Sequence, residues 1–320
     1  MLAAKRTRVC WLDIMFNRIV LLTDLSASTK LAFTPLRAFS EMFKAQVVIF
    51  HAFRGSSDLF SLGGDATQMR TMIDESDRQR VMPALLAIQA ELAELGVAAE
   101  IETRVGSTFD LALTVLDELG ADLVVVATQG FQDFTGKVLG SPTARLLHHA
   151  KIPVLTVNDQ FMERSKSFAN CHRIVHPIDF NGPWQLTVGA VEGVAAELGG
   201  RVDVIDVIAP VYDQTLATPE GQILLPKDLQ YTLRSKMQAR LSDAAHTIVK
   251  VPAHWHLIED HKPGSAVMAY ADRCAADLIV IHAIGRDQVR NALLGSVAEH
   301  VVKHARCPVL SVPDVWAAAR

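Results

Sequence analysis

The chain has few cysteines, no long apolar run and no large excess of charge. Only four of its 320 residues are cysteine. They lack the paired spacing of a metal site and are typical of reduced cytosolic thiols, although sequence alone leaves a disulfide open. No apolar run reaches the ~18 residues that a membrane span needs. The formal net charge of −4 argues against general affinity for nucleic acid or an acidic membrane surface.

The sequence also lacks a recognisable catalytic constellation. It contains no nucleophile elbow and no paired acid and base. His254 and His256 would share one face of a strand and, with the nearby His261, invite comparison with a metal site. No cysteine or carboxylate set completes such a site at a known spacing, so polar residues on an edge strand are the preferred interpretation.

The first residues imitate a signal peptide only weakly. Basic residues at positions 5, 6 and 8 precede a short apolar run, but Asp13, Asn17 and Arg18 interrupt it. We expect a disordered leader here, with Met15 as an alternative start.

What the chain does contain is one pattern that occurs twice. Residues 121–157 read ADLVVVATQGFQDFTGKVLGSPTARLLHHAKIPVLTV, and residues 276–312 read ADLIVIHAIGRDQVRNALLGSVAEHVVKHARCPVLSV. The two stretches are related by a constant offset of 155 residues, which also relates Asp24 to Asp179. The chain is therefore a tandem duplication.

The length suits two domains of about 150 residues each. Half of all residues are hydrophobic, so each half can bury a sizeable core. The expected organisation is a leader (1–15), a first domain (16–158), a linker (159–171), a second domain (172–314) and a tail (315–320).

Strands alternate with helices in both halves, which predicts an α/β fold with a doubly wound parallel sheet and right-handed crossovers. Two stretches, 54–72 and 210–226, are expected to be long loops and candidate lids. Long helices are expected after them, over 74–95 and 227–249.

The repeated stretch has the parts that hold a phosphate group. An apolar strand ends in a glycine loop, and a helix starts at Gly140-Ser141. Glycine lets backbone N–H groups approach an anion, and the first helical turn offers unpaired N–H groups with partial positive charge. Ligands of such sheets sit where the strand order reverses. With order 3-2-1-4-5, Asp24 and Gly130 would face one crevice.

Three features together resemble the universal stress protein family. They are an aspartate after the first strand, the spacing Gly-x-x-Gly-x9-Gly-Ser after the fourth, and a closing His-Ala-x-x-Pro-Val-Leu-x-Val. The resemblance covers nearly the whole chain, twice. It implies two Rossmann-like five-stranded sheets of order 3-2-1-4-5 in tandem. It also implies that the last strands pair as an intrachain pseudo-dimer, and a further homodimer of whole chains stays open.

The resemblance further implies bound ATP, with or without Mg²⁺, with adenine near the aspartate and phosphates on the glycine loop and serine. The implied binding residues are Asp24, Ala127, Gly130, Gly140 and Ser141 in the first half, and Asp179, His282, Gly285, Gly295 and Ser296 in the second.

The two halves depart from the motif differently. Its first glycine is replaced by Ala127 in one half and His282 in the other. Alanine is tolerated where φ is negative, whereas histidine either blocks the crevice or donates a hydrogen bond to phosphate. The second loop carries more cations than the first. We favour the first half, because a blocked crevice is worse than a missing cation.

The same residues also fit helix capping without a ligand. Ser141-Pro142 is good capping chemistry, and Ser296 with Glu299 reads as a capping box. In the family the cap and the phosphate site are one structure, so the two interpretations are compatible.

The sequence therefore predicts a cytoplasmic stress-response regulator that binds an adenine nucleotide and has at most slow ATP hydrolysis. The alternatives are a nucleotide-free dimerising scaffold acting through protein partners and, more remotely, an enzyme of the related adenine-nucleotide hydrolase superfamily. A phospho-accepting Asp24 is disfavoured, since Ile152-Pro153 stands where a receiver domain needs Lys-Pro.

Overall fold

A computed structural model gives the fold of most of the chain. It describes residues 16–53, 66–106, 108–128, 142–163, 172–180, 182, 184–210, 215–218, 221–283, 295–314 and 316. The two glycine loops, 129–141 and 284–294, lie outside these ranges.

The first half alternates strands and helices as expected. Its elements are β1 (Arg18–Leu22), the 3-10 helix η1 (Ala27–Ala32), α1 (Phe33–Phe43), β2 (Gln46–Phe53), α2 (Ala66–Glu94), β3 (Ala99–Val105), α3 (Thr108–Glu118), β4 (Leu123–Thr128), α4 (Pro142–His149) and β5 (Val154–Asn158). A second short 3-10 helix, η3 (Asp159–Glu163), begins the stretch expected to be the linker.

The helix after β2 begins earlier than expected. α2 starts at Ala66, so the last seven residues of the expected loop 54–72 are helical. The glycines of that loop end at Gly64, and residues 66–82 contain no glycine or proline. Residues 54–65 lie outside the described ranges.

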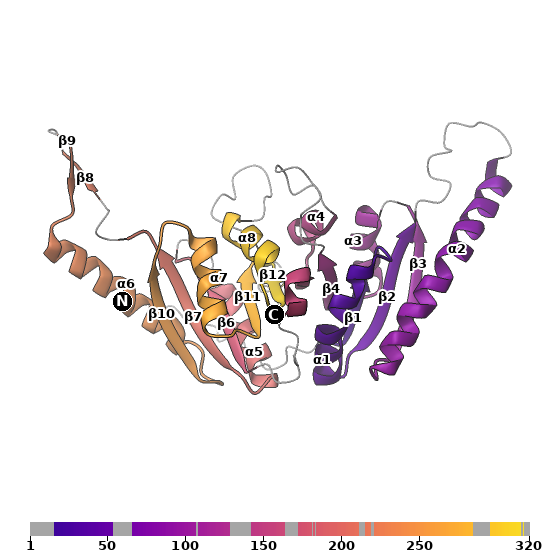
Figure 1. Ribbon diagram of the computed structural model, residues 1–320, viewed down its shortest axis with the longest axis horizontal. Helices are drawn as coiled ribbons and strands as arrows, with labels where there is room; N and C mark the ends of the chain where they lie inside the picture. Colours follow the sequence, from indigo (N-terminus) through magenta and orange to yellow (C-terminus); the bar gives the residue numbers. More distant parts are fainter. Residues whose placement is uncertain are drawn as a thin grey trace, which may run out of the picture.

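The second half repeats the plan with one addition. Its elements are β6 (Arg173–Pro177), α5 (Gln185–Glu197), β7 (Arg201–Ile208), β8 (Thr215–Thr218), β9 (Gly221–Leu224), α6 (Lys227–His246), β10 (Ala253–Glu259), α7 (Pro263–Arg273), β11 (Leu278–His282), α8 (Ser296–His304) and β12 (Val309–Val312). The expected loop 210–226 is thus wrong in part, because it contains the antiparallel pair β8–β9, in which Thr218 pairs with Gly221. A two-residue connection of this kind is typical of a hairpin. Figure 1 shows the pair projecting beyond α6.

Both halves contribute to one sheet. Its order is β10-β7-β6-β11-β12-β5-β4-β1-β2-β3, so each half has the predicted order 3-2-1-4-5. Strands within a half are parallel, whereas β5 and β12 pair antiparallel with Leu155 opposite Leu310. Thr156 Oγ1 also donates to the Val309 carbonyl at 3.2 Å. The predicted joining of the two domains through their last strands is confirmed (Figure 1).

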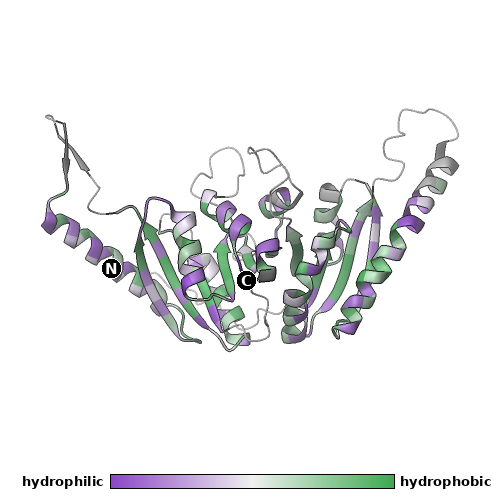
Figure 2. Ribbon diagram, in the orientation of Figure 1, coloured by the Kyte–Doolittle hydropathy of each residue, from purple (hydrophilic) through white to green (hydrophobic). Residues whose placement is uncertain are grey.

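Two apolar cores sandwich the sheet. One lies under α1, α2, α5 and α6, and the other under α3, α4, α7 and α8. Each core runs through both halves. Alternate residues of β1 face opposite cores, with Ile19 and Leu21 on one side and Val20 and Leu22 on the other. Burial on both faces explains the unbroken apolar strands, coloured green in Figure 2.

The beginning and the end of the described chain meet. The rings of Phe16 and Trp316 stack with centroids 6.1 Å apart, and Phe43 meets Phe16 edge-on at 4.9 Å. Both Phe16 and Trp316 are buried.

In the part of the chain that the structure describes, no helix is both long enough and apolar enough to cross a membrane.

Candidate functional site

The strand order reverses between β1 and β4 in the first half. These strands pair up to Leu22 and Val126. Asp24 and Ala127 follow directly and therefore lie at the same edge of the sheet. Four of the implied binding residues lie outside the described ranges, namely Gly130, Gly140 and Ser141 in this half and Gly285 in the second.

The turn after β1 is held by its own polar groups. The buried Thr23 places its Oγ1 2.7 Å from Thr29 Oγ1 and accepts the Leu25 N–H at 2.9 Å. The exposed Asp24 accepts the Ser26 N–H at 2.9 Å through Oδ1, which is an Asx turn. Its other oxygen makes no hydrogen bond to the described residues. The carboxylate is therefore fixed at the edge with one oxygen available.

A buried histidine supports this turn from β2. His51 Nδ1 lies 2.8 Å from the Thr23 carbonyl. A carbonyl only accepts, so Nδ1 carries the hydrogen. The buried His51 therefore supports the backbone of this turn.

Ala127 lies against an apolar cluster. Leu31 from η1, Val157 from β5 and Phe161 from η3 form this cluster, and Ala127 packs on it. The space beside Ala127 on this face is therefore occupied by side chains of the first half itself.

The reversal point of the second half, between β6 and β11, is polar. The two strands pair only at Ile174–Leu278 and Val175–Ile279. Beyond that point, His176 Nδ1 donates to the Val280 carbonyl at 2.9 Å, and its Nε2 lies 3.2 Å from Thr187 Oγ1. His176 is buried, and burial lowers its pKa to about 4. The neutral ring of His176 thus makes a hydrogen bond between β6 and β11 beyond the last backbone pair of the two strands.

His282, the counterpart of Ala127, is held by a carboxylate. Its Nε2 bonds to Asp314, which follows β12. Asp179 is exposed beyond the end of β6, at the same edge of the sheet. The second half therefore brings His176, His282 and Asp314 together where the first half has Leu21 and Ala127 with Asp159.

The sequence reasoning missed His176, Thr187 and Asp314. At the 155-residue offset, Leu21 and Ala32 stand opposite His176 and Thr187. A comparison of the two halves position by position was the signal that could have found them.

The start of α8 departs from the expected capping box. Gly295 is the N-cap with φ −57° and ψ 141°, and Ser296 is already the first helical residue. No side chain caps the helix, and Glu299 instead pairs with Lys303 at 2.5 Å. The capping-box prediction is wrong, because Ser296 sits one position too late and Lys303 is an i,i+4 partner for the carboxylate. Among the residues that the structure describes, the first-turn N–H groups of α8 thus have no side-chain acceptor.

The histidines of β10 do not assemble a site. His254 and His256 are exposed on an edge strand of the sheet. Among the described residues, no group of three histidine, cysteine, aspartate or glutamate side chains is arranged to hold a metal ion.

Comparison with known proteins identifies both halves. The model of the universal stress protein family matches residues 15–158 and 170–313. The chain belongs to the universal stress protein family. It carries two domains of this family in tandem.

Several universal stress proteins are similar over different spans. One from Mycolicibacterium smegmatis is 28% identical over 255 residues, which cover 75% of this chain and 77% of that protein. One from Methanocaldococcus jannaschii is 42% identical over 62 residues, covering 19% of this chain and 36% of that relative. The crystal structure of a universal stress protein from Archaeoglobus fulgidus superposes with a TM-score of 0.63 at 17% identity, covering 93% of this chain and 99% of that one. At this identity the structural likeness shows the fold alone.

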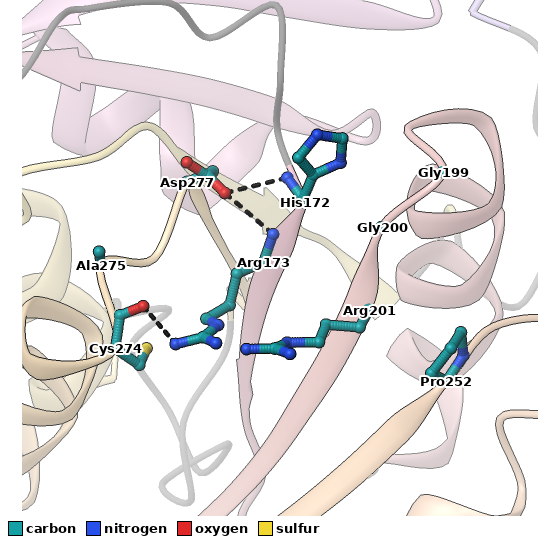
Figure 3. A pocket seen from close by; sticks show the side chains of 9 residues that line it. All are labelled: His172, Arg173, Gly199, Gly200, Arg201, Pro252, Cys274, Ala275 and Asp277. Carbon is teal, nitrogen blue, oxygen red and sulfur yellow. Dashed lines mark hydrogen bonds between the residues drawn. The ribbon is translucent and has the colours of Figure 1, made fainter.

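The second universal stress protein domain has a cavity at the edge of the sheet opposite to the predicted nucleotide crevice. Its volume is about 640 Å³, and it is lined by His172, Arg173, Gly199, Gly200, Arg201, Pro252, Cys274, Ala275 and Asp277 (Figure 3). These residues stand at the amino ends of β6, β7, β10 and β11, the opposite edge from His282 and Asp179. The cavity is therefore distinct from the predicted nucleotide crevice.

Proposed function

We propose that this universal stress protein binds an adenine nucleotide, ATP, in at least one of its two domains. It acts as a cytoplasmic stress-response regulator and not as a fast enzyme. Family membership supports adenine-nucleotide binding in general, and the geometry at the reversal points supports it here.

The observation that carries the proposal is the start of α8. A helix whose first-turn N–H groups have no side-chain cap favours an anion, through both free donors and the helix dipole. Gly295 presents no side chain at that end. Phosphate oxygens would accept from these N–H groups and from the Ser296 hydroxyl.

The strand-one aspartates fit the other end of the nucleotide. Asp24 is exposed and oriented by the Ser26 N–H. In this proposal Asp24 or Asp179 accepts hydrogen bonds from the adenosine part. The loop residues Gly130, Gly140 and Ser141, or Gly285, Gly295 and Ser296, hold the phosphates. In this proposal ATP, with or without Mg²⁺, supplies charge and contacts.

Regulation follows from a shift of populations. ATP stabilises the arrangement of the protein that contacts it best, and so changes the surface offered to a protein partner. A ligand shifts such an equilibrium only by its difference in affinity for the two arrangements.

The test starts with the purified protein. Denaturation should release adenine nucleotide into the supernatant, where chromatography or mass spectrometry detects it. Saturating ATP should also raise the melting temperature, since a ligand that binds only the folded state stabilises it. Gly140→Val and Gly295→Val, made singly, assign the site to the first or the second domain.

A nucleotide-free scaffold is the second candidate. It is favoured by the packing of Leu31, Val157 and Phe161 on Ala127, which fills part of the first crevice. If no nucleotide is released and saturating ATP leaves the melting temperature unchanged, the scaffold is the better account. Multi-turnover ATP hydrolysis would instead favour an enzyme.

A further inference from the structure

The cavity at the amino end of the second domain contains two arginines side by side. Arg173 and Arg201 are partners in the parallel register of β6 and β7. Both line the cavity, and Figure 3 shows their guanidinium groups approaching each other. Like charges on adjacent strands are destabilising unless an anion lies near them.

In the first domain, the equivalent arginine has a neutral partner in place of a second arginine. Arg18, the counterpart of Arg173, has Gln46 as its register partner. Arg18 donates to Gln46 Oε1 at 2.8 Å and to the Leu119 carbonyl at 2.5 Å. Arg173 keeps the second contact, donating to the Cys274 carbonyl at 2.5 Å. The change from Gln46 to Arg201 thus exchanges an acceptor for a second cation.

The acidic groups near the cavity compensate Arg173 but make no printed contact with Arg201. Asp277 Oδ2 accepts the backbone N–H groups of His172 and Arg173, both at 2.9 Å, as Asp122 does in the first domain. Asp203 is buried beneath, 3.9 Å from Arg173 Nε, and also accepts from Tyr270. The Arg201 guanidinium makes no hydrogen bond or ion pair within the part of the chain described.

Tyr270, behind the lining residues, acts as a donor to Asp203. Its hydroxyl lies 3.2 Å from Asp203 Oδ2. Burial, and then the Asp203 charge, raise the pKa of Tyr270 above its ordinary value, so the phenol stays protonated. Asp203 is therefore shared between Tyr270 and Arg173, and Arg201 is left facing the cavity.

The size and the lining of the cavity indicate the size and the charge of a ligand that would fit it. A volume of about 640 Å³ is within the range of small-molecule sites and larger than a single phosphate requires. Gly199, Gly200 and Ala275 keep the walls small, and Pro252 adds an apolar surface. A guanidinium pair suits a planar or tetrahedral oxyanion that accepts several hydrogen bonds at once.

We propose that this cavity is a second ligand site, separate from the nucleotide crevice, which binds a small organic anion through its carboxylate or phosphate group. Arg201 and Arg173 grip the anionic group, and the small and apolar wall residues accommodate the rest of the molecule.

The test is calorimetric titration of the full chain with inorganic phosphate and, separately, with succinate. Arg201→Gln reproduces the Arg18–Gln46 pair of the first domain and is therefore expected to fold. It should weaken binding at least about ten-fold, as expected for the loss of a charge-assisted contact. Arg201→Lys keeps the positive charge but loses the two parallel N–H donors of the guanidinium group, and should bind with intermediate affinity. Arg37→Gln, which removes one surface charge in the first domain, should bind like the wild type.

The two probes distinguish the source of the anion. Binding of phosphate alone assigns a phosphorylated ligand, binding of succinate alone a carboxylate, and binding of both a general oxyanion site. Absence of both, or equal affinities in wild type, Arg201→Gln and Arg201→Lys, overturns the proposal. ATP titration of Arg201→Gln should match the wild type. A wild type that binds succinate but no ATP would defeat the nucleotide proposal and leave this one intact.

Discussion

His176 is a buried polar side chain at a position where the first domain has Leu21. Its two ring nitrogens face the Val280 carbonyl and Thr187 Oγ1, and the ring is fully enclosed. The environment suits the neutral ring, and burial lowers the pKa of His176 to about 4. This residue therefore links the stability of the second domain to pH.

Lowering the pH from 7 to 4 should destabilise the protein through His176. The unfolded histidine titrates near 6.5 and the folded one near 4, so the unfolded state binds more protons in this window. The stabilising contribution is fully present above pH 6.5 and falls by about 3 kcal/mol toward pH 4. Urea unfolding at several pH values measures it.

The control for this pH dependence is a variant of the second domain that carries the residues found at the equivalent positions of the first domain. His176→Leu with Thr187→Ala reproduces the Leu21 and Ala32 pair and leaves no unpaired hydroxyl. This double variant should lose most of the pH dependence between 4 and 6.5. A slope equal to that of the wild type would assign the effect to other groups.

Ala275 adopts a conformation that glycine prefers. Its φ is 53°, whereas its counterpart in the first domain is Gly120 with φ 60°. A side chain in the left-handed region costs up to about 1 kcal/mol, which glycine avoids. Ala275→Gly should therefore raise the free energy of unfolding by up to that amount, and Gly120→Ala should lower it. Thermal unfolding of both variants checks the pair, and an unchanged or lower stability of Ala275→Gly would contradict the reasoning.

At the scale of elements, a glutamate joins α5 to the connection between α6 and β10. The buried Glu192 accepts the N–H groups of Val249 and Lys250 through one oxygen, both at 2.6 Å. Its counterpart in the first domain is Arg37, so this anchor belongs to the second domain alone.

Glu192→Ala should destabilise the protein by about 1–3 kcal/mol, because two part-buried N–H groups lose a charged acceptor. The exposed Glu197→Ala on the same helix should change stability by no more than about 0.5 kcal/mol. Urea unfolding compares the two, and hydrogen exchange should show faster exchange at the end of α6 in Glu192→Ala only. Equal effects of the two substitutions would argue against the anchor.

The elements that sequence predicted best are those specified by local pattern. β7 is an example, because Gly200 precedes its largely apolar run and Pro210 follows it. The hairpin β8–β9 was missed, since its strands are only four residues each and show no strong alternation. The start of α2 was misplaced because the glycines and serines before it suggested a longer loop.

The candidate site was predictable only in part. The repeat offset and the reversal of strand order predicted which positions meet at the sheet edge. The contacts of His282 with Asp314 and of Ala127 with Leu31 depend on packing between distant segments, which no local pattern encodes. The Arg173–Arg201 pair likewise required the register of β6 with β7.

At the scale of the whole molecule, the end of the chain packs on its beginning. Trp316 is buried against Phe16, close to Phe39 and Phe43 of α1. This contact ties the segment that follows the second domain to the first domain.

Trp316→Ala should lower the free energy of unfolding by about 3–5 kcal/mol, the usual cost of removing a large buried aromatic side chain. Tyr231→Ala is the control, since Tyr231 is 75% exposed. The urea concentration at the unfolding midpoint should be clearly lower for Trp316→Ala than for the wild type. The midpoint of Tyr231→Ala should be close to that of the wild type. Similar midpoints for the two variants would mean that the ends of the chain are not coupled.

The antiparallel meeting of β5 and β12 has a directional consequence. The five strands that one domain contributes to the ten-stranded sheet run opposite to the five of the other. Each rim of this sheet therefore combines the carboxyl ends of one domain with the amino ends of the other. A protein that docks along one rim therefore reaches the turn after the first strand of a single domain. If both domains bound a ligand, each would therefore present its ligand-binding turn to a different protein partner, one at each rim of the sheet.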